Sequence, residues 1–338
     1  MTRWIAALAM GLAAPAAAQK PPASPTALFA SDVPIKVTIR GPFATLVLNR
    51  AEIARPGTMS VDGATYPITL APRGITRLRK ETCDFPPLRV RLTQAAPAGS
   101  LFERQRSLKL VTHCKRSPEF QQKVLLEYSA YRLYNLMTPQ SFRARLANID
   151  YLDEAGHPFA SRVGFFIEDF SDVAKRNGMR DAKMGSLVPV GQIDPTSGAR
   201  FAIFENMISN YDWSMRAAPK GEECCHNARM MTAGGPGSPL SVVPYDFDFS
   251  GLVDAPYAGV PEGIPVSDLK ERTYRGYCMH MTQARLLASQ LSTRRAEFTG
   301  VFAMIPGLDQ RNQSRAASFI QGFFSDLDHG RVFKSCVN

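Results

Sequence analysis

The sequence predicts an α+β fold in two lobes, a β-rich N-terminal lobe and a mainly helical C-terminal lobe. Residues 33–40 place apolar side chains at every second position, which is typical of a half-buried strand. The first pattern of helical length is 117–136, where apolar residues recur at intervals of three and four. Three more helices are expected at 277–291, 294–304 and 314–329. The strands follow one another too closely for crossover helices, so a parallel α/β sheet is not expected.

The remaining elements follow from the same patterns and complete the two lobes. Asp62-Gly63 predicts a hairpin turn between two strands. We place the β-rich small lobe at 32–170, with the long helix inside it, and the large lobe at 171–338. The other predicted strands are 45–49, 59–70, 73–79, 88–93, 108–112, 142–151 and 162–168, and the other predicted helices are 171–177 and 199–211.

The N-terminal residues 1–18 have the pattern of a cleavable signal peptide. Arg3 gives a short positive region, an apolar run follows, and small residues at 16–18 predict cleavage before Gln19. The mature protein is then expected to be periplasmic or secreted, with a flexible Pro- and Ala-rich leader at 19–31. No later stretch approaches the eighteen apolar residues of a membrane span, so no transmembrane anchor is expected.

The charge of the chain is compatible with anionic ligands. The 40 Lys and Arg exceed the 30 Asp and Glu, giving a formal net charge of +10. A basic cleft that binds phosphates would account for part of this excess, and so would a basic soluble surface. No basic motif with interleaved aromatic residues and no zinc-finger spacing is present, so nucleic acid is not an expected partner.

The cysteines predict disulfides. Six cysteines after a signal peptide indicate three bridges. A bridge between Cys83 and Cys114 is expected because these two residues flank neighbouring predicted strands. The adjacent pair in the middle of the chain is expected to bond to the two C-terminal cysteines. In chain order the six are Cys83, Cys114, Cys224, Cys225, Cys278 and Cys336.

Acidic and amide residues in the second half of the chain predict a site for a hard cation. Asp212 ends an apolar helical run, Asn227 follows His226, and Asp246 and Asp248 stand at the exit of an apolar strand. Residues two apart on a strand point the same way, so these two carboxylates would repel without a cation or a basic group between them. Mg²⁺ prefers oxygen ligands and usually takes one or two carboxylates together with phosphate oxygens.

Three short motifs in this region resemble those of the CotH-type (spore coat protein H) atypical protein kinases. The resemblance covers roughly residues 80–258, and the family's pattern is approximately N-x-D, then H-N, then P-W-D-L-D. It implies a bilobal, protein-kinase-like fold and metal-dependent transfer of phosphate from ATP to a protein Ser/Thr or another hydroxyl. Fourteen residues separate Asp212 from Asn227, more than in the family, and this insert would loop out. The motifs are Asn210-Tyr211-Asp212, His226-Asn227 and Pro244-Tyr245-Asp246-Phe247-Asp248.

The resemblance also implies a role for each acidic and amide residue. Asp212 would orient or deprotonate the acceptor hydroxyl. Asn227 and Asp246 would hold Mg²⁺ or Mn²⁺, and Asp248 would support that ion or a second one. His226 is expected to pack against the loop or hydrogen-bond to it rather than bind the metal.

The small lobe would supply a cation for the nucleotide phosphates and a helix carboxylate that pairs with it. Arg91 is the positional match for the family's lysine, and Lys109 is the alternative. Glu127, on the predicted 117–136 helix, is the expected partner of whichever cation is used. Glu168 resembles the family's Y-x-L-x-E element near the hinge between the lobes.

Two other functions remain open from the sequence. A non-catalytic, kinase-derived binding or envelope-structural protein would keep the same residues without transferring phosphate. A metal-dependent hydrolase would use Asp212, Asp246 and Asp248, although no histidines stand at the spacing typical of such metal sites.

Overall fold

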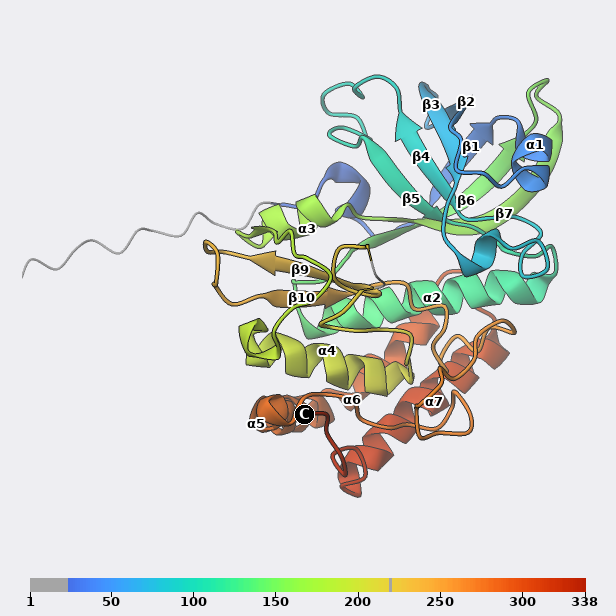
Figure 1. Cartoon of the computed structure of the whole chain (residues 1–338). Helices are drawn as coiled ribbons and strands as arrows, with labels where there is room; N and C mark the ends of the chain where they lie inside the picture. The colour runs from blue at the N-terminus through green and yellow to red at the C-terminus, as the bar shows by residue number, and fades with distance from the viewer. Residues whose placement is uncertain (1–23, 219–220) are drawn as a thin grey trace, which may run out of the picture.

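The fold consists of a β-barrel above a mainly helical part, joined through a long helix (Figure 1). It is a computed structural model that describes residues 24–218 and 221–338. The predicted signal peptide at 1–18 and the leader residues up to 23 lie outside the described residues. Residues 24–31, expected to be part of a flexible leader, include a short 3-10 helix, η1 (Ala27–Phe29), whose Leu28 and Phe29 are buried.

Seven strands close into a barrel in the first half of the chain. Alternation fixes their faces, so that the apolar side chains of β1 point inward while its polar ones stay exposed. Asp62 and Gly63, both with positive φ, form the predicted turn between β2 and β3. The strand order around the barrel is β1-β2-β3-β4-β5-β7-β6. The strands are β1 (Ile35–Arg40), β2 (Arg55–Val61), β3 (Ala64–Pro72), β4 (Leu88–Leu92), β5 (Ser107–Val111), β6 (Ala144–Leu152) and β7 (Pro158–Ile167).

The expected bilobal, protein-kinase-like fold is wrong. β1 pairs in parallel with β6, from Ile35 opposite Ala147 to Arg40 opposite Leu152, and this pairing closes a mixed seven-stranded barrel. The second half is not simply a helical lobe, because β8 (Arg180–Asp181), β9 (Ala228–Thr232) and β10 (Ser241–Pro244) form a sheet of their own. Alternation identifies a strand, but it carries no information about which distant strand will pair with it.

Two of the predicted strands are helical instead. The apolar run around 45–49 lies in helix α1 (Phe43–Leu48), because a run this short fits a helix turn as well as a strand. Residues 73–79 form a turn at Gly74 and the 3-10 helix η2 (Thr76–Leu78). Both segments line cavities described below.

Helices are the main regular elements of the second half. The predicted 117–136 helix is α2, and α4, α5, α6 and α7 lie beneath it, whereas α3 lies above it beside the barrel (Figure 1). The helices are α2 (Pro118–Met137), α3 (Phe170–Arg176), α4 (Pro195–Ile208), α5 (Met281–Thr293), α6 (Arg295–Gly300) and α7 (Gln310–Asp328), with short 3-10 helices η3 (Val190–Gln192), η4 (Cys278–His280) and η5 (Val301–Met304).

Helix α2 packs between the barrel and the second half of the chain. The barrel interior forms one large cluster of buried side chains, and α2 belongs to a second large cluster, which fills the second half and includes Phe165 of β7. Tyr131 of α2 lies with its ring 5.6 Å from that of Phe165 in β7 and 4.7 Å from that of Phe247 after β10. This contact sets the position of the segment after β10 against the barrel.

The structure contains three disulfides. Cys83 bonds to Cys114, the pair expected from the sequence. The expectation for the other four cysteines is wrong, because Cys224 bonds to its neighbour Cys225 and Cys278 bonds to Cys336. Within the described residues, no helix combines the length and the apolarity needed to cross a bilayer.

Candidate functional site

A cavity of about 370 Å³ lies where the barrel meets the second half of the chain. We call it the central cavity. One wall comes from the barrel, through the loop after β3 and the end of β5, and the other from the α4–β9 connection and the segment after β10. The charged residues that line it are Arg73, Arg77, Lys109, Asp212, Glu222, His226, Asp246 and Asp248.

Asp212 is fixed by the tight turn that ends α4. Ser209 closes the helix in the left-handed conformation, with φ of 52°. The amide of Asp212 then donates to Oδ1 of Asn210 (3.1 Å), and the indole Nε1 of Trp213 donates to the carbonyl of Asn210 (2.8 Å). Because Asn210 and Trp213 are buried, the Asp212 side chain is held at the cavity wall.

His226 and Asn227 both bind Asp212. The Nε2 atom of His226 lies 2.7 Å from Oδ1 of Asp212, and this hydrogen bond raises the pKa of the imidazole. The Nδ2 atom of Asn227 donates to Oδ2 (3.0 Å) and to the carbonyl oxygen (2.7 Å) of Asp212. His226 and Asn227 therefore lie beside Asp212 although they are well separated from it in sequence. The expectation for His226 included a hydrogen bond within this region, and the bond it forms orients the carboxylate of Asp212.

Asp246 and Asp248 lie in the turn after β10, because the strand ends at Pro244. Asp246 has φ of 66°, and its amide donates to the hydroxyl of Tyr131 (3.1 Å). Asp248 is buried, and its Oδ2 accepts from the hydroxyl of Tyr257 (2.8 Å). Burial and the nearby charge of Asp246 raise the pKa of Asp248 to about 6. Both carboxylates line the cavity as expected, although a turn rather than a strand places them there.

The cation paired with Glu127 is Arg77, not Arg91 or Lys109. Nη1 of Arg77 lies 3.6 Å from Oε2 of Glu127, and its Nη2 donates to the carbonyl of Thr112 (2.5 Å). Both side chains are buried. Burial, followed by the negative charge of Asp248, raises the pKa of Glu127 well above its ordinary value.

Lys109 extends from β5 into the central cavity. Its ammonium lies 4.8 Å from the centre of the Tyr245 ring, within the range of a cation–π contact. Burial and then the charge of Arg73 lower the pKa of Lys109 to about 8, against an opposing effect of Asp246. A lysine held in this way gains from an anionic ligand that restores its charge.

Arg91 and Glu168 are not among the residues that line the central cavity. Arg91 is exposed on β4 and lines a separate groove. Glu168 is buried, with Oε1 at 3.0 Å from Nε of Arg176, and its Oε2 accepts from the amide of Arg143 (2.9 Å). Glu168 lines a different cavity, which has Lys109 in common with the central cavity. The carboxylate of Glu168 therefore forms a buried ion pair with Arg176 outside the central cavity.

Sequence reasoning missed four residues of the site. Arg73 and Arg77 lie on either side of Gly74 in a loop whose sequence pattern predicted a strand. The only signal for them was the excess of basic residues in this region. Tyr131 and Tyr257 hold Asp246 and Asp248 through hydroxyl groups. Neither tyrosine leaves a local signal, because each reaches its aspartate through the tertiary fold.

The acidic residues fit a cation that arrives with a phosphate ligand. Within residues 24–218 and 221–338, no group of three or more His, Cys, Asp and Glu converges to hold a metal ion. Asp246 and Asp248 nevertheless line one cavity, and Asn227 keeps Oδ1 as an acceptor while its Nδ2 faces Asp212. Mg²⁺ is commonly held by one or two carboxylates and completed by phosphate oxygens and water, so a closed protein cage is not required.

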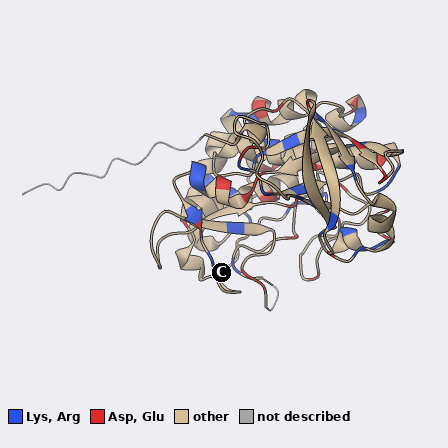
Figure 2. Ribbon diagram, turned by 90° about the horizontal axis from the view of Figure 1, so that it is seen from above, with Lys and Arg blue, Asp and Glu red and all other residues tan. Residues whose placement is uncertain are grey.

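Charge in the described chain is distributed over both parts rather than gathered on one element (Figure 2). No family model matches the chain, and a search of the curated proteins finds no similar sequence. The geometry of the central cavity therefore carries the functional argument.

Proposed function

We propose that the central cavity binds ATP with Mg²⁺ or Mn²⁺ and transfers a phosphoryl group to a hydroxyl, either of a protein Ser/Thr or of another acceptor. The observation that supports this function is the meeting of Asp212, Asn227, Asp246 and Asp248 with Lys109 in one cavity. These residues come from three separate segments of the chain. Phosphoryl transfer depends on positioning and charge stabilisation, which such a set supplies.

The barrel side would bind the phosphates. Lys109 and Arg73 line the cavity and offer positive charge opposite the aspartates. Asp246 and Asp248, with Oδ1 of Asn227, would hold the divalent cation, which supplies charge neutralisation on the phosphate oxygens. Arg77 also lines the cavity, but its guanidinium is paired with the buried Glu127.

Asp212 would accept the proton of the acceptor hydroxyl. Its carboxylate is partly exposed (30%), and His226 and Asn227 fix its orientation. A carboxylate that is held in one orientation at the cavity wall is the arrangement a general base needs.

A non-catalytic binding protein is the second candidate. Its support is that both oxygens of Asp212 already have hydrogen-bond partners, in His226 and Asn227. The same cavity would then hold a phosphorylated ligand without turning it over.

We further propose that the protein acts outside the cytoplasm, in the periplasm or as a secreted protein. Three disulfides support an oxidising compartment. The pattern of residues 1–18 supports export.

The test is a melting shift with ATP and Mn²⁺, followed by a phosphotransfer assay. ATP at a hundred times its dissociation constant should stabilise the protein by about 2.7 kcal/mol. Asp246→Asn should abolish the metal-dependent shift, while Asp212→Asn should keep the shift and lose phosphotransfer. Asp328→Asn, at an exposed position far along the chain, is the control.

Each result separates the candidates. A shift without phosphotransfer in the parent protein would favour the binding protein. No shift with ATP and either metal would rule out phosphotransfer from ATP and would favour the binding protein. A shift lost equally in Asp212→Asn and Asp246→Asn would place Asp212 in the metal site rather than on the acceptor side.

A further inference from the structure

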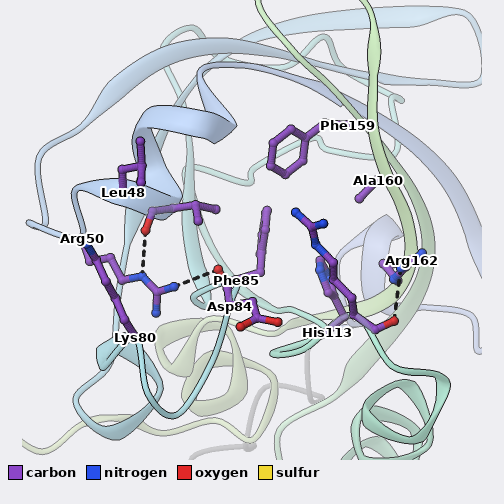
Figure 3. Close-up of a pocket in the computed structure, with 11 residues that line it drawn as sticks. Leu48, Arg50, Lys80, Asp84, Phe85, His113, Phe159, Ala160 and Arg162 are labelled. Atoms are coloured by element: carbon purple, nitrogen blue, oxygen red, sulfur yellow. Dashed lines mark hydrogen bonds between the residues drawn. The ribbon is translucent and has the colours of Figure 1, made fainter.

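A second cavity, of about 600 Å³, lies beside helix α1 (Figure 3). We call it the α1 cavity. It shares no lining residue with the central cavity. Its walls come from the end of α1, the segments around 80–85 and 113–116, and the start of β7. The proposed phosphotransfer assigns it no role.

The interior of the α1 cavity is apolar and largely aromatic. Phe85 is buried at its base, and the Phe159 ring lies 6.3 Å from the Phe85 ring (Figure 3). Leu48 stands at the rim with 70% of its surface exposed. An apolar ligand body would cover this surface.

Positive charge surrounds the apolar interior. Lys80 and Arg116 are exposed lining residues, and neither forms an ion pair with any residue in the described part of the chain. Arg162 donates only to backbone carbonyls, those of Ser161 (2.7 Å) and Arg116 (3.2 Å). The one carboxylate among the lining residues is that of Asp84. The residues that line the cavity therefore carry more positive than negative charge.

A fourth lining cation, Arg50, belongs to the framework of the cavity. Its Nε donates to the carbonyl of Val47 (3.1 Å), and its Nη2 donates to the carbonyl of Asp84 (2.8 Å). Its Nη1 reaches the carbonyls of Leu78 (3.2 Å) and Arg79 (3.3 Å). Arg50 thus ties α1 to the 80–85 segment and leaves Lys80, Arg116 and Arg162 to meet a ligand.

His113 places an unpartnered polar group in the wall of the α1 cavity. Its side chain is buried, with 2% of the residue exposed, and its ring lies 4.6 Å from that of Phe85. Nδ1 has no hydrogen-bond partner among the described residues. Burial, aided by Arg162, lowers the pKa of the imidazole to about 3, so the ring is neutral at physiological pH. A buried polar atom without a partner costs free energy unless something binds it.

The Cys83–Cys114 disulfide holds the two walls together. Cys83 precedes Asp84 and Phe85, and Cys114 follows His113, so the bond joins the two segments that carry these lining residues. A cavity with a covalently fixed base is preformed, which lowers the entropic cost of binding a ligand.

We propose that the α1 cavity binds an amphipathic organic anion, whose apolar body packs on Phe85 and Phe159 and whose carboxylate meets Lys80, Arg116 and Arg162. Apolar walls with a few placed polar groups are typical of small-molecule sites. Arginine suits the carboxylate because its guanidinium presents parallel donors to two oxygens. Such a ligand could be a medium-chain aliphatic acid or an aromatic acid, which share this chemistry.

The test compares four probes by isothermal titration calorimetry with the full mature chain. Decanoate and 2-naphthoate each carry an apolar body and a carboxylate, decanol lacks the charge, and acetate lacks the body. At least one of the two amphipathic acids should bind ten times more tightly than decanol and acetate. The acid that binds more tightly shows whether the cavity prefers an aliphatic or an aromatic body. Failure of both acids to bind, or decanol binding as tightly as decanoate, would overturn the proposal.

Exposed residues allow variants that keep the fold. Leu48→Asp places a negative charge at the apolar rim, and the double variant Lys80→Gln/Arg116→Gln removes two unpaired cations. Each should weaken binding of the preferred acid at least fivefold. The matched control is Arg311→Gln/Lys334→Gln, two exposed cations that do not line this cavity. Equal weakening in the control would show that overall charge, not the α1 cavity, attracts the acid, and would overturn the proposal.

Discussion

The central cavity and the α1 cavity place positive charge in opposite settings. Arg77 and Lys109 line the central cavity together with Asp246 and Asp248, and Arg77 also pairs with the buried Glu127. The α1 cavity holds several cations against the single carboxylate of Asp84, above an aromatic base. The carboxylates and cations of the central cavity suit a ligand that consists of a metal ion and phosphates. The excess of cations in the α1 cavity suits an organic anion with an apolar body.

The two cavities also differ in how their walls are held. A covalent bond, Cys83–Cys114, fixes the α1 cavity. Hydrogen bonds and ion pairs between distant segments fix the central one, such as Asn227 on Asp212 and Tyr131 on Asp246. A substitution in one cavity should therefore weaken the ligand of that cavity and leave the ligand of the other bound. The loss of stability should also differ between the two cavities.

The largest effect is expected from Cys83→Ser/Cys114→Ser. The bond closes a loop with a sequence separation of 31, and its removal should lower the free energy of unfolding by about 3–4 kcal/mol. Urea denaturation measures this loss. The same variant should weaken binding of the preferred acid at the α1 cavity and leave the ATP-dependent melting shift in place. Cys278→Ser/Cys336→Ser is the control, since it removes a bond that touches neither cavity.

The sequence was informative for short-range features and for the order of the site residues. Alternation located β1, the Asp62-Gly63 pair located the β2–β3 turn, and the spacing of apolar residues located α2. The closing of the barrel was not predictable, because β1 and β6 are about a hundred residues apart and their pairing leaves no local mark.

The candidate site shows the same limit. Asp212, Asn227, Asp246 and Asp248 line one cavity in the structure. On the basic side Lys109 lines this cavity and Arg91 does not, and the sequence did not identify Arg77 as the partner of the buried Glu127. That choice depends on how the loop after β3 folds over α2, which periodicity does not report.

The next largest effect is expected from Arg77→Met, which leaves Glu127 buried without its partner. Breaking a buried pair from one side costs on the order of 3 kcal/mol, because the remaining charge is uncompensated or must take up a proton. The double variant Arg77→Met/Glu127→Gln should recover most of this loss in thermal or urea unfolding. If Glu127→Gln gave no recovery, Arg77 would stabilise the fold through its hydrogen bond to Thr112 rather than through the ion pair.

A smaller effect should appear in the pH dependence of stability through His113. Its folded pKa of about 3 lies below the ordinary value of 6.5, so the unfolded chain binds a proton that the folded chain does not. This contribution to stability is present above pH 6.5 and declines as the pH falls toward 3. Between pH 7 and pH 5 the loss amounts to about 2 kcal/mol.

The matched variant for this measurement is His113→Phe, which keeps an aromatic ring against Phe85. Urea denaturation at pH 7 and pH 5 should show a loss for the variant that is smaller by about 2 kcal/mol than for the parent. Other groups that titrate in this range, such as Asp248, are common to both proteins and cancel in the comparison. Equal losses in the two proteins would mean that His113 is protonated in the folded state.

The smallest predicted effect is in the pH dependence of ATP affinity, and it tests Lys109 against Arg91. Lys109 has a pKa of about 8 in the free protein, so it loses its charge as the pH rises through that value. If it must be charged to hold the phosphates, affinity should fall about tenfold between pH 7 and pH 9, or about 1.4 kcal/mol. Lys109→Arg, which stays charged throughout, should show a flatter profile.

Two controls accompany this measurement. His226, whose pKa is raised by its hydrogen bond to Asp212, is present in both proteins, so the difference between their profiles isolates Lys109. Arg91→Gln should match the parent at every pH because Arg91 lies outside the cavity. A parent profile as flat as that of Lys109→Arg would remove Lys109 from the phosphate site, and a loss of affinity in Arg91→Gln would return that role to Arg91.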